Sequence, residues 1–182
     1  MCIRDRCVDS DEYGGAEVSL VNLVESSDAD YQFHLIGPRT VGMQELARRL
    51  PDIPVSYVTS YGSKNLRTVN EYRKVVASVN PDILQVTLCN PGAAMAVQLA
   101  GVSLGVRVIA IEQLVRPLGY RPGRILKRLV SRFLFDHVAV GRLSSREVED
   151  YFWLPRNSVR TIYNGVEAVS YTHLTLPTIL LV

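Results

Sequence analysis

The stretch "DILQVTLCNPGAAMAVQLAGVSLGVRVIAIEQ", residues 82–113, decides the fold. Two apolar runs, 82–89 and 106–113, have the composition of buried strands. Between them, Asn90 precedes a proline at the first helical position, and the predicted helix stops at Gly101. A strand, a helix and a second strand in this order predict a βαβ crossover that joins two parallel strands.

The same alternation continues on both sides of this unit. Several of the predicted strands are nearly continuous apolar runs, as expected for parallel strands that are buried on both faces. The chain therefore predicts an α/β fold: a Rossmann-like, mainly parallel sheet with helices on both faces. The further expected strands are 7–10, 31–38, 53–60, 136–141 and 159–165, and the further expected helices are 16–27, 41–50, 65–79, 123–135 and 144–152.

Composition excludes several classes of protein. The 182 residues are 47% hydrophobic and 21% charged, which is enough apolar material for a sizeable core. A net charge of +2 gives no overall nucleic-acid footprint, and no run of 18 apolar residues predicts a membrane span. Cys2, Cys7 and Cys89 lie far apart and indicate reduced thiols in a cytoplasmic protein.

Both ends of the chain resemble translated sequencing adaptor. Met1–Arg6 back-translates naturally as ATG TGT ATA AGA GAC AG, and Ser170–Leu174 as TCT TAT ACA CAT CT. The two strings are reverse complements over their shared core and resemble the end of a transposon used to fragment DNA. We expect residues 1–6 and 168–182 to be adaptor-derived. Residues 7–167 would then be the natural part of a longer protein, with a truncated first strand that is central in the sheet.

Ligands of such sheets bind at the carboxyl ends of the strands, and this rule selects the candidate site residues. Gly14 and Gly15 follow the first strand, where backbone amides and a helix N-terminus can approach a phosphate; a turn that needs positive φ is the alternative. Two other strand ends supply further candidates. Thr87 and Asn90 are at the first, where Asn90 can instead cap the following helix. Glu112 and Gln113 are at the second, where they can bind sugar hydroxyls or instead satisfy the loop backbone.

The remaining polar positions have ordinary structural explanations. Gly141, Ser144 and Ser145 suggest a helix N-cap, and the spacing of Ser144 and Glu147 is that of a capping box. Asn164–Gly165 is typical of a turn. His34 and His137 lie in or beside apolar strands and are expected to be packed and hydrogen-bonded. No His, Cys and Asp cluster has metal-ligand spacing, so we predict no metal and no other cofactor.

A basic amphipathic helix follows the fourth complete strand. No acidic residue lies between Gln113 and Asp136, and apolar residues interleave with the cations. Such a helix can lie on the inner face of an anionic membrane; a sheet-covering helix with a solvated basic face is the alternative. The predicted membrane contacts are Arg121, Arg124, Lys127 and Arg128.

Taken together, "EYGGAE", "PDILQVTLCNPGAA", "VRVIAIEQ" and "DHVAVGRLSSREVEDYFWLPRNSVRTIYNGVE" resemble the N-terminal domain of GT-B glycosyltransferases of family 4. The resemblance covers nearly all of residues 7–167. It implies a retaining enzyme that moves a sugar from a nucleotide-sugar to a glycan or lipid-linked acceptor. It also implies a second, donor-binding domain that this chain lacks, so the chain alone is expected to be inactive.

The resemblance also implies roles for single residues. Gly14 and Gly15 would approach the donor phosphates, and Asn164 and Gly165 would form the interdomain hinge. Thr87, Asn90, Glu112 and Gln113 would contact the acceptor. Many relatives have a histidine where Gln113 stands, and glutamine cannot act as a base, so the catalytic residues stay unassigned. A GT-B nucleotide-sugar epimerase and a non-catalytic sugar- or membrane-binding module are the alternatives.

Overall fold

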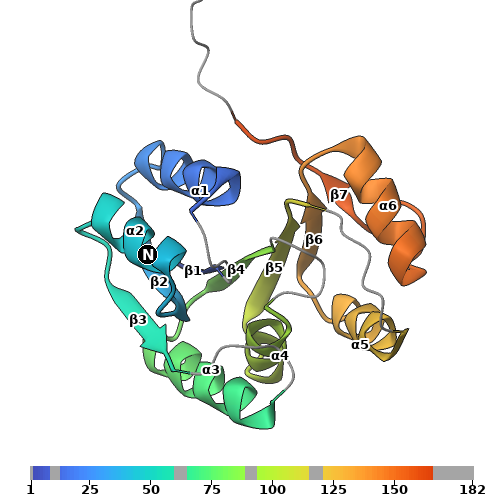
Figure 1. Ribbon diagram of the computed structural model, residues 1–182, viewed down its shortest axis with the longest axis horizontal. Coiled ribbons are helices and arrows are strands. Elements are labelled where there is room, and N and C mark those ends of the chain that lie inside the picture. Colours follow the sequence, from blue (N-terminus) through green and yellow to red (C-terminus); the bar gives the residue numbers. More distant parts are fainter. Residues whose placement is uncertain (1, 9–12, 60–64, 89–93, 115–120, 166–182) are drawn as a thin grey trace, which may run out of the picture.

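The computed structural model describes residues 2–8, 13–59, 65–88, 94–114 and 121–165, and of residues 2–8, 121 and 122 it describes the backbone alone. The described residues form one seven-stranded sheet with the order β3-β2-β1-β4-β5-β6-β7 (Figure 1). Every neighbouring pair of strands is parallel. The predicted Rossmann-like α/β fold is therefore confirmed.

The elements alternate along the whole described chain. The strands are Cys2–Val8 (β1), Tyr31–Pro38 (β2), Val55–Val58 (β3), Ile83–Leu88 (β4), Arg107–Glu112 (β5), Asp136–Ala139 (β6) and Arg160–Thr161 (β7). The helices are Gly15–Glu25 (α1), Val41–Arg49 (α2), Leu66–Val79 (α3), Met95–Ser103 (α4), Arg121–Ser131 (α5) and Arg142–Phe152 (α6).

Strand β1 is central, as the sequence predicts for the first strand. It pairs with β2 on one side and with β4 on the other, and Arg4 stands opposite both Phe33 and Ile83. The residues expected to derive from adaptor thus supply the first part of the strand on which both halves of the sheet meet. Their origin stays a prediction.

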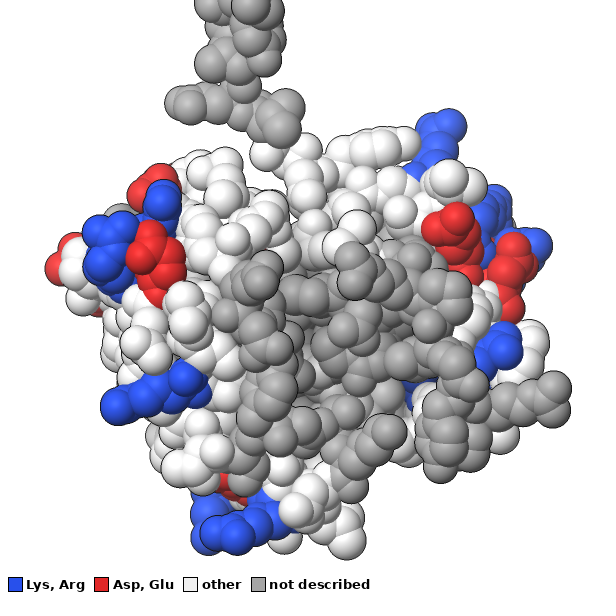
Figure 2. Space-filling model, viewed as in Figure 1, with Lys and Arg blue, Asp and Glu red and all other residues white. Residues whose placement is uncertain are grey.

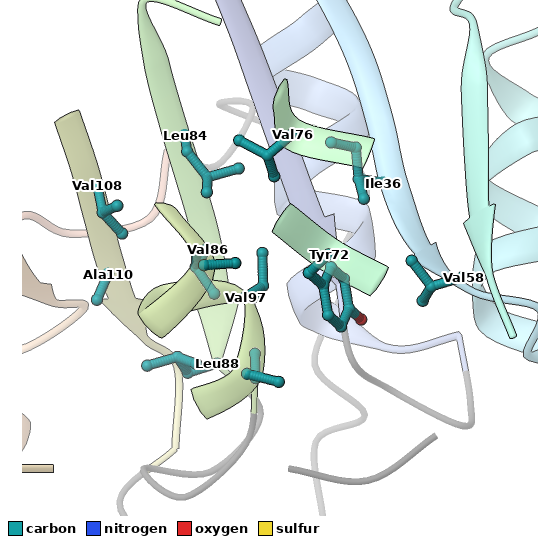
Figure 3. Close-up of a cluster of buried hydrophobic side chains, with 13 residues drawn as sticks. Ile36, Val58, Tyr72, Val76, Leu84, Val86, Leu88, Val97, Val108 and Ala110 are labelled. Atoms are coloured by element: carbon teal, nitrogen blue, oxygen red, sulfur yellow. The ribbon is translucent and has the colours of Figure 1, made fainter. Parts of the chain in front are cut away.

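Helices cover the two faces of the sheet unequally. Alternate residues of β2 show this: Leu35 packs with residues of α1 and α2, whereas Ile36 packs with residues of α3 and α4. Right-handed crossovers place α1 and α2 over β1 to β3 on one face and the remaining helices on the other face. The larger core cluster lies between the sheet and α3 and α4, where Tyr72, Val76 and Val97 meet the strand side chains (Figure 3).

Helix α4 corrects the sequence prediction at both ends. It begins at Met95, and its N-cap is Ala94 in a left-handed conformation; Asn90, the predicted cap, lies outside the described residues. The helix also continues through Gly101. A Cβ at Gly101 would lie 2.6 Å from Val108 Cγ2 and 2.7 Å from Leu84 Cδ2, so glycine there permits a close approach of helix and sheet rather than a helix end.

Helix α6 also begins earlier than predicted. Gly141 is its N-cap, with φ −162°, so Ser144 is already a helical residue and the predicted capping box with Glu147 is wrong. Ser145 instead donates a hydrogen bond to the Gly141 carbonyl at 3.0 Å and shares a second one with Thr161 Oγ1 at 2.7 Å. Through these bonds the start of α6 is attached to β7.

Candidate functional site

A hollow of about 740 Å³ lies on the face of the sheet that α3 to α6 leave uncovered. Residues of α1 form one wall, residues of β4, β5 and β6 form the floor, and Arg160 with residues 162–165 forms another wall. Four of the floor residues are aliphatic and three are polar. The floor residues are Gln85, Thr87, Ile109, Ile111, Asp136, Val138 and Val140.

A polar bridge crosses the hollow at the carboxyl edge of the sheet. Asn164 Nδ2 donates to Gln113 Oε1 at 3.0 Å, and Ser19 Oγ donates to Asn164 Oδ1 at 3.2 Å. The bridge joins the end of β5, helix α1 and the segment after β7. The structure thus brings together Gln113 and Asn164, which the sequence assigned to different roles, and adds Ser19. Ser19 gave no sequence signal because a serine on a polar helix face is ordinary.

The turn predicted at Asn164 and Gly165 stays a prediction, because the residues after Gly165 lie outside the described ones. Residues Ile162–Gly165 are neither helix nor strand, and Gly165 lines the hollow beside Asn164. Thr87 also lines the hollow, with a side chain that is almost fully buried. Of the predicted acceptor-side residues, Thr87 and Gln113 therefore share one site, whereas Asn90 lies outside the described residues.

Gly14 and Gly15 stand at the start of α1, but neither has the positive φ of the alternative turn explanation. Gly14 is the N-cap with φ −141°, which any residue can adopt, and Gly15 is the first helical residue. A Cβ at Gly15 would meet nothing within 4 Å, and one at Gly14 would make only an ordinary 3.5 Å contact with Glu17 Oε2. Neither positive φ nor crowding within the described residues therefore requires glycine at these two positions.

Glu17 is a buried neighbour of the glycine pair whose role the sequence prediction missed. Its side chain is 2% exposed, and its Oε2 accepts the backbone amide of Gly14 at 2.8 Å. An acidic residue three positions after an N-cap is the second half of a capping box, and this signal was available in "GGAE". The carboxylate fixes the first turn of α1 and already occupies the amide of Gly14.

Glu112 does not face the hollow, which corrects its predicted acceptor role. It has the same parity in β5 as Val108 and Ala110, whose side chains pack toward α4 on the opposite face. There Glu112 Oε1 lies 3.0 Å from Lys127 Nζ and 2.9 Å from His137 Nε2. Only Gln113, the next residue, points to the carboxyl edge.

Lys127 is likewise turned inward, so its predicted membrane contact is wrong. Its side chain is fully buried, and its Nζ donates to Gln98 Oε1 at 3.2 Å as well as pairing with Glu112. A buried ammonium needs such partners because an unpaired charge in the interior is costly. Lys127, Glu112, His137 and Gln98 form one buried polar cluster between β5, β6, α4 and α5.

Burial and charge set the protonation of this cluster. For Glu112, burial favours the neutral acid, but Lys127 and His137 outweigh it and the pKa of Glu112 is lowered. For His137, burial is the largest influence and lowers the pKa, although the bond to Glu112 acts in the other direction. His137 is thus a packed, hydrogen-bonded histidine, as predicted, and so is His34, whose Nε2 lies 2.9 Å from Ser56 Oγ.

The Arg124 side chain also contacts other residues of the chain, on α6 and directly after it. Its Nε donates to the Tyr151 carbonyl at 2.8 Å, and its guanidinium lies 4.2 Å from the Tyr151 ring centroid and 4.0 Å from that of Trp153. The residue joins α5 to the end of α6. Among the four cations predicted to contact a membrane, Arg128 is exposed, and the side chain of Arg121 lies outside the described ones.

The described residues contain neither a metal site nor a membrane-spanning helix. Within residues 13–59, 65–88, 94–114 and 121–165, no group of three His, Cys, Asp or Glu side chains is placed to hold a metal ion. In the same ranges, no helix has the length and apolarity to cross a bilayer. The charged side chains on the face shown in Figure 2 gather near its rim.

Comparison with solved structures shows the same architecture in longer chains. A glycosyltransferase from Rickettsia africae is 15% identical with a TM-score of 0.67, over 91% of this chain and 44% of its own. HepE from Anabaena in complex with UDP is 17% identical with a TM-score of 0.67, over 92% and 45%. A UDP-GlcNAc 2-epimerase from Methanocaldococcus jannaschii is 16% identical with a TM-score of 0.61, over 90% and 46%.

This chain thus spans less than half the length of these structures, and its fold is one Rossmann-like half of a GT-B fold. No curated protein matches it in sequence. A family model does: the one described as Glycosyltransferase Family 4 matches residues 13–169, which include α1, the polar bridge and the whole hollow. The chain belongs to glycosyltransferase family 4.

Proposed function

We propose that this chain is the acceptor-side half of a retaining glycosyltransferase that moves a sugar from a nucleotide-sugar to a glycan or lipid-linked acceptor. The observation that carries the proposal is the bridge of Ser19, Asn164 and Gln113 at the carboxyl edge of the sheet. Ligands of open parallel sheets bind at this edge. The bridge places amide and hydroxyl groups there, which suit sugar hydroxyls.

Each residue at this edge has a defined part in the proposal. The Gln113 amide and the Thr87 hydroxyl orient acceptor hydroxyls, and Asn164 with Gly165 form the hinge to a second domain. Gln113 cannot remove a proton at neutral pH, so the residues of this chain contribute by positioning the acceptor. The cations that stabilise the leaving diphosphate come from the second domain.

The donor phosphates approach Gly14 and Gly15 in this proposal. The absence of a backbone reason for glycine at both positions supports it, because a side chain there would obstruct none of the residues that the structure describes. The Glu17 carboxylate occupies the Gly14 amide, so the phosphate contacts fall on the amides of the next residues. HepE of Anabaena has been solved with UDP and with UDP-glucose, which supports a nucleotide-sugar as donor.

One assay with two proteins tests the proposal. The longer protein that contains residues 7–167 is incubated with UDP-sugars and acceptors, and transfer is followed by release of UDP and by the anomeric configuration of the product. We expect retention in the longer protein, activity in the presence of a chelator, and no turnover by the 182-residue chain alone. Inversion would contradict the retaining mechanism, and a requirement for a metal would contradict metal-independent transfer. Turnover by the 182-residue chain alone would refute the expectation that it is inactive.

An epimerase is the second candidate because two solved UDP-GlcNAc 2-epimerases, from Rickettsia bellii and Methanocaldococcus jannaschii, share the fold with TM-scores of 0.59 and 0.61. Such an enzyme would convert a nucleotide-sugar without an acceptor. A change of the sugar configuration with no acceptor present would therefore favour the epimerase. Binding of the nucleotide-sugar with neither reaction would favour a non-catalytic module.

A further inference from the structure

Helix α5 departs from the usual distribution of side chains on a surface helix. Such a helix normally turns its apolar stripe inward and its charges outward. In α5, Lys127 is completely buried, whereas Ile125 is 52%, Leu126 41% and Leu129 49% exposed. Three large aliphatic side chains therefore lie on the outside while an ammonium group lies on the inside.

Polar contacts fix this orientation. Lys127 pairs with Glu112 and donates to Gln98, and Arg124 is held by the Tyr151 carbonyl and the rings of α6. Turning the helix by half a revolution would bury the leucines but would leave Glu112 without its cation. The outward position of the aliphatic residues is therefore a property of the fold.

The outward residues form two adjacent rows. At 100° per residue, Ile125, Leu129 and Phe133 follow one another four positions apart, with Leu126 beside them. Phe133, in the turn after the helix, is 69% exposed. Arg128 and Arg132, also four positions apart and both exposed, lie next to this row. We name these six residues the α5 outer surface.

The charge around the α5 outer surface is positive. The stretch from Leu114 to Phe135 contains no acidic residue. On the neighbouring helix α6, Glu149 is buried and paired with Arg146, and Asp150 pairs with Arg156 at 2.7 Å. Glu147, the other acidic residue of α6, is exposed and belongs to neither of these ion pairs; it is one negative charge against the two arginines.

We propose that the α5 outer surface docks on an anionic lipid bilayer. The helix lies in the plane of the interface, the aliphatic and aromatic row enters the acyl boundary, and Arg128 and Arg132 meet lipid phosphates. Long arginine side chains can keep their charge at headgroup level while their stems lie on the apolar row. The sequence predicted a contact through Arg121, Arg124, Lys127 and Arg128. The proposed contact keeps Arg128, omits the other three and adds Arg132 and the apolar residues.

The test is co-sedimentation of the 182-residue chain with vesicles of phosphatidylcholine and phosphatidylglycerol, and with vesicles of phosphatidylcholine alone. We expect binding to the anionic vesicles that weakens as salt is added. Arg128→Glu with Arg132→Glu should lower the partition coefficient by more than about tenfold. Ile125→Ser with Leu129→Ser should also lower the partition coefficient. For this variant, the difference from the original chain should persist at high salt.

Matched variants on α3 serve as controls. Arg73→Glu with Lys74→Glu makes the same change of net charge on exposed residues, and Leu66→Ser removes an exposed aliphatic side chain. Both should leave vesicle binding unchanged. Retained emission of Trp153, the single tryptophan, and an unchanged far-ultraviolet spectrum verify that each variant folds.

Three results would overturn the proposal. They are no sedimentation with anionic vesicles, equal losses in the α3 and α5 variants, and equal binding to neutral vesicles that the arginine variants do not alter. A dimer that the Ile125 and Leu129 substitutions convert to a monomer, without vesicle binding, would instead identify a second copy of the chain as the occupant.

Discussion

Lys127 Nζ lies 3.0 Å from Glu112 Oε1, and neither side chain is exposed to solvent. The pair connects α5 to the last residue of β5, directly next to Gln113 in the candidate site. Two further groups complete it: His137 Nε2 contacts the same carboxylate oxygen, and Gln98 accepts from Lys127. The position of the site edge and the orientation of α5 thus depend on one buried ion pair.

Substitution of Lys127 by methionine should be strongly destabilising. The change leaves the Glu112 carboxylate buried without its cation, and we expect the free energy of unfolding to fall by about 3–5 kcal/mol. Arg128→Met, at the exposed neighbouring position, should change it by less than about 0.5 kcal/mol. Urea unfolding of both variants measures the difference, and equal effects would show that Lys127 is not held by the pair.

The stability of the chain should decrease as the pH falls below about 6.5. Burial lowers the pKa of His137 in the folded state, whereas the unfolded histidine takes up a proton near its ordinary pKa of about 6.5. The unfolded state therefore binds more protons as the pH falls, and the free energy of unfolding declines.

The same sign holds for two other groups. The pKa of His34 is also lowered by burial, and the lowered pKa of Glu112 adds a further loss below its ordinary value of about 4.3. His137→Gln should flatten the decline between about pH 5 and pH 7 in unfolding curves. A variant that declines as steeply as the original chain would contradict the assignment to His137.

Gly101→Ala should lower stability although alanine is the better helix former. The added Cβ would lie 2.6 Å from Val108 Cγ2 and 2.7 Å from Leu84 Cδ2, both in the core. Overpacking costs about 1–3 kcal/mol, and the gain in helix propensity offsets about 1 kcal/mol of it. Thermal unfolding measures the net loss, and a higher melting temperature would show that α4 can move away from the sheet.

Gly14→Ala and Gly15→Ala should separate binding from folding. Neither change meets a close contact within the described chain. Gly15→Ala, inside the helix, should leave stability unchanged or raise it by up to about 1 kcal/mol. Gly14→Ala should lower it by less than about 1 kcal/mol, because alanine is a poorer N-cap than glycine. In the longer protein, both changes should raise KM for the nucleotide-sugar because a methyl group would obstruct the phosphates. Unaltered KM in both variants would remove the donor-phosphate role of the pair.

Arg124→Lys should not behave as a conservative change. The guanidinium stacks on two rings and donates to the Tyr151 carbonyl, and a lysine cannot reproduce the planar stack. We expect a loss of about 1–2 kcal/mol in urea unfolding and a change in the emission of Trp153. An emission spectrum and midpoint equal to those of the original chain would contradict the stacking role.

The sequence predicted the strands and most helices because their periodicity is strong, and Asn65 and Asn80 mark the ends of α3 as expected. It failed where tertiary contacts override local signals. A glycine that usually ends a helix permits close packing at Gly101, and a serine that usually caps a helix binds β7 at Ser145. Neither fact is encoded in neighbouring residues.

The candidate site was only half predictable for a similar reason. The carboxyl-edge rule identified Thr87, Gln113 and Asn164, since it depends on where each strand stops. It could not tell that Glu112 points to the opposite face, because one residue of register reverses the direction of a strand side chain. The inward position of Lys127 follows from that reversal, and only the packed structure shows it.

The central position of β1 has a consequence for synthesis on the ribosome. Residues up to Val58 contain β1, β2 and β3 with both helices of their face, so this portion can assemble early. Its β1 edge stays open until β4 emerges, because β4 forms the other side of the strand. A nascent chain paused before Leu88 therefore carries an unpaired strand edge, which is where a chaperone or an aggregating neighbour would attach first.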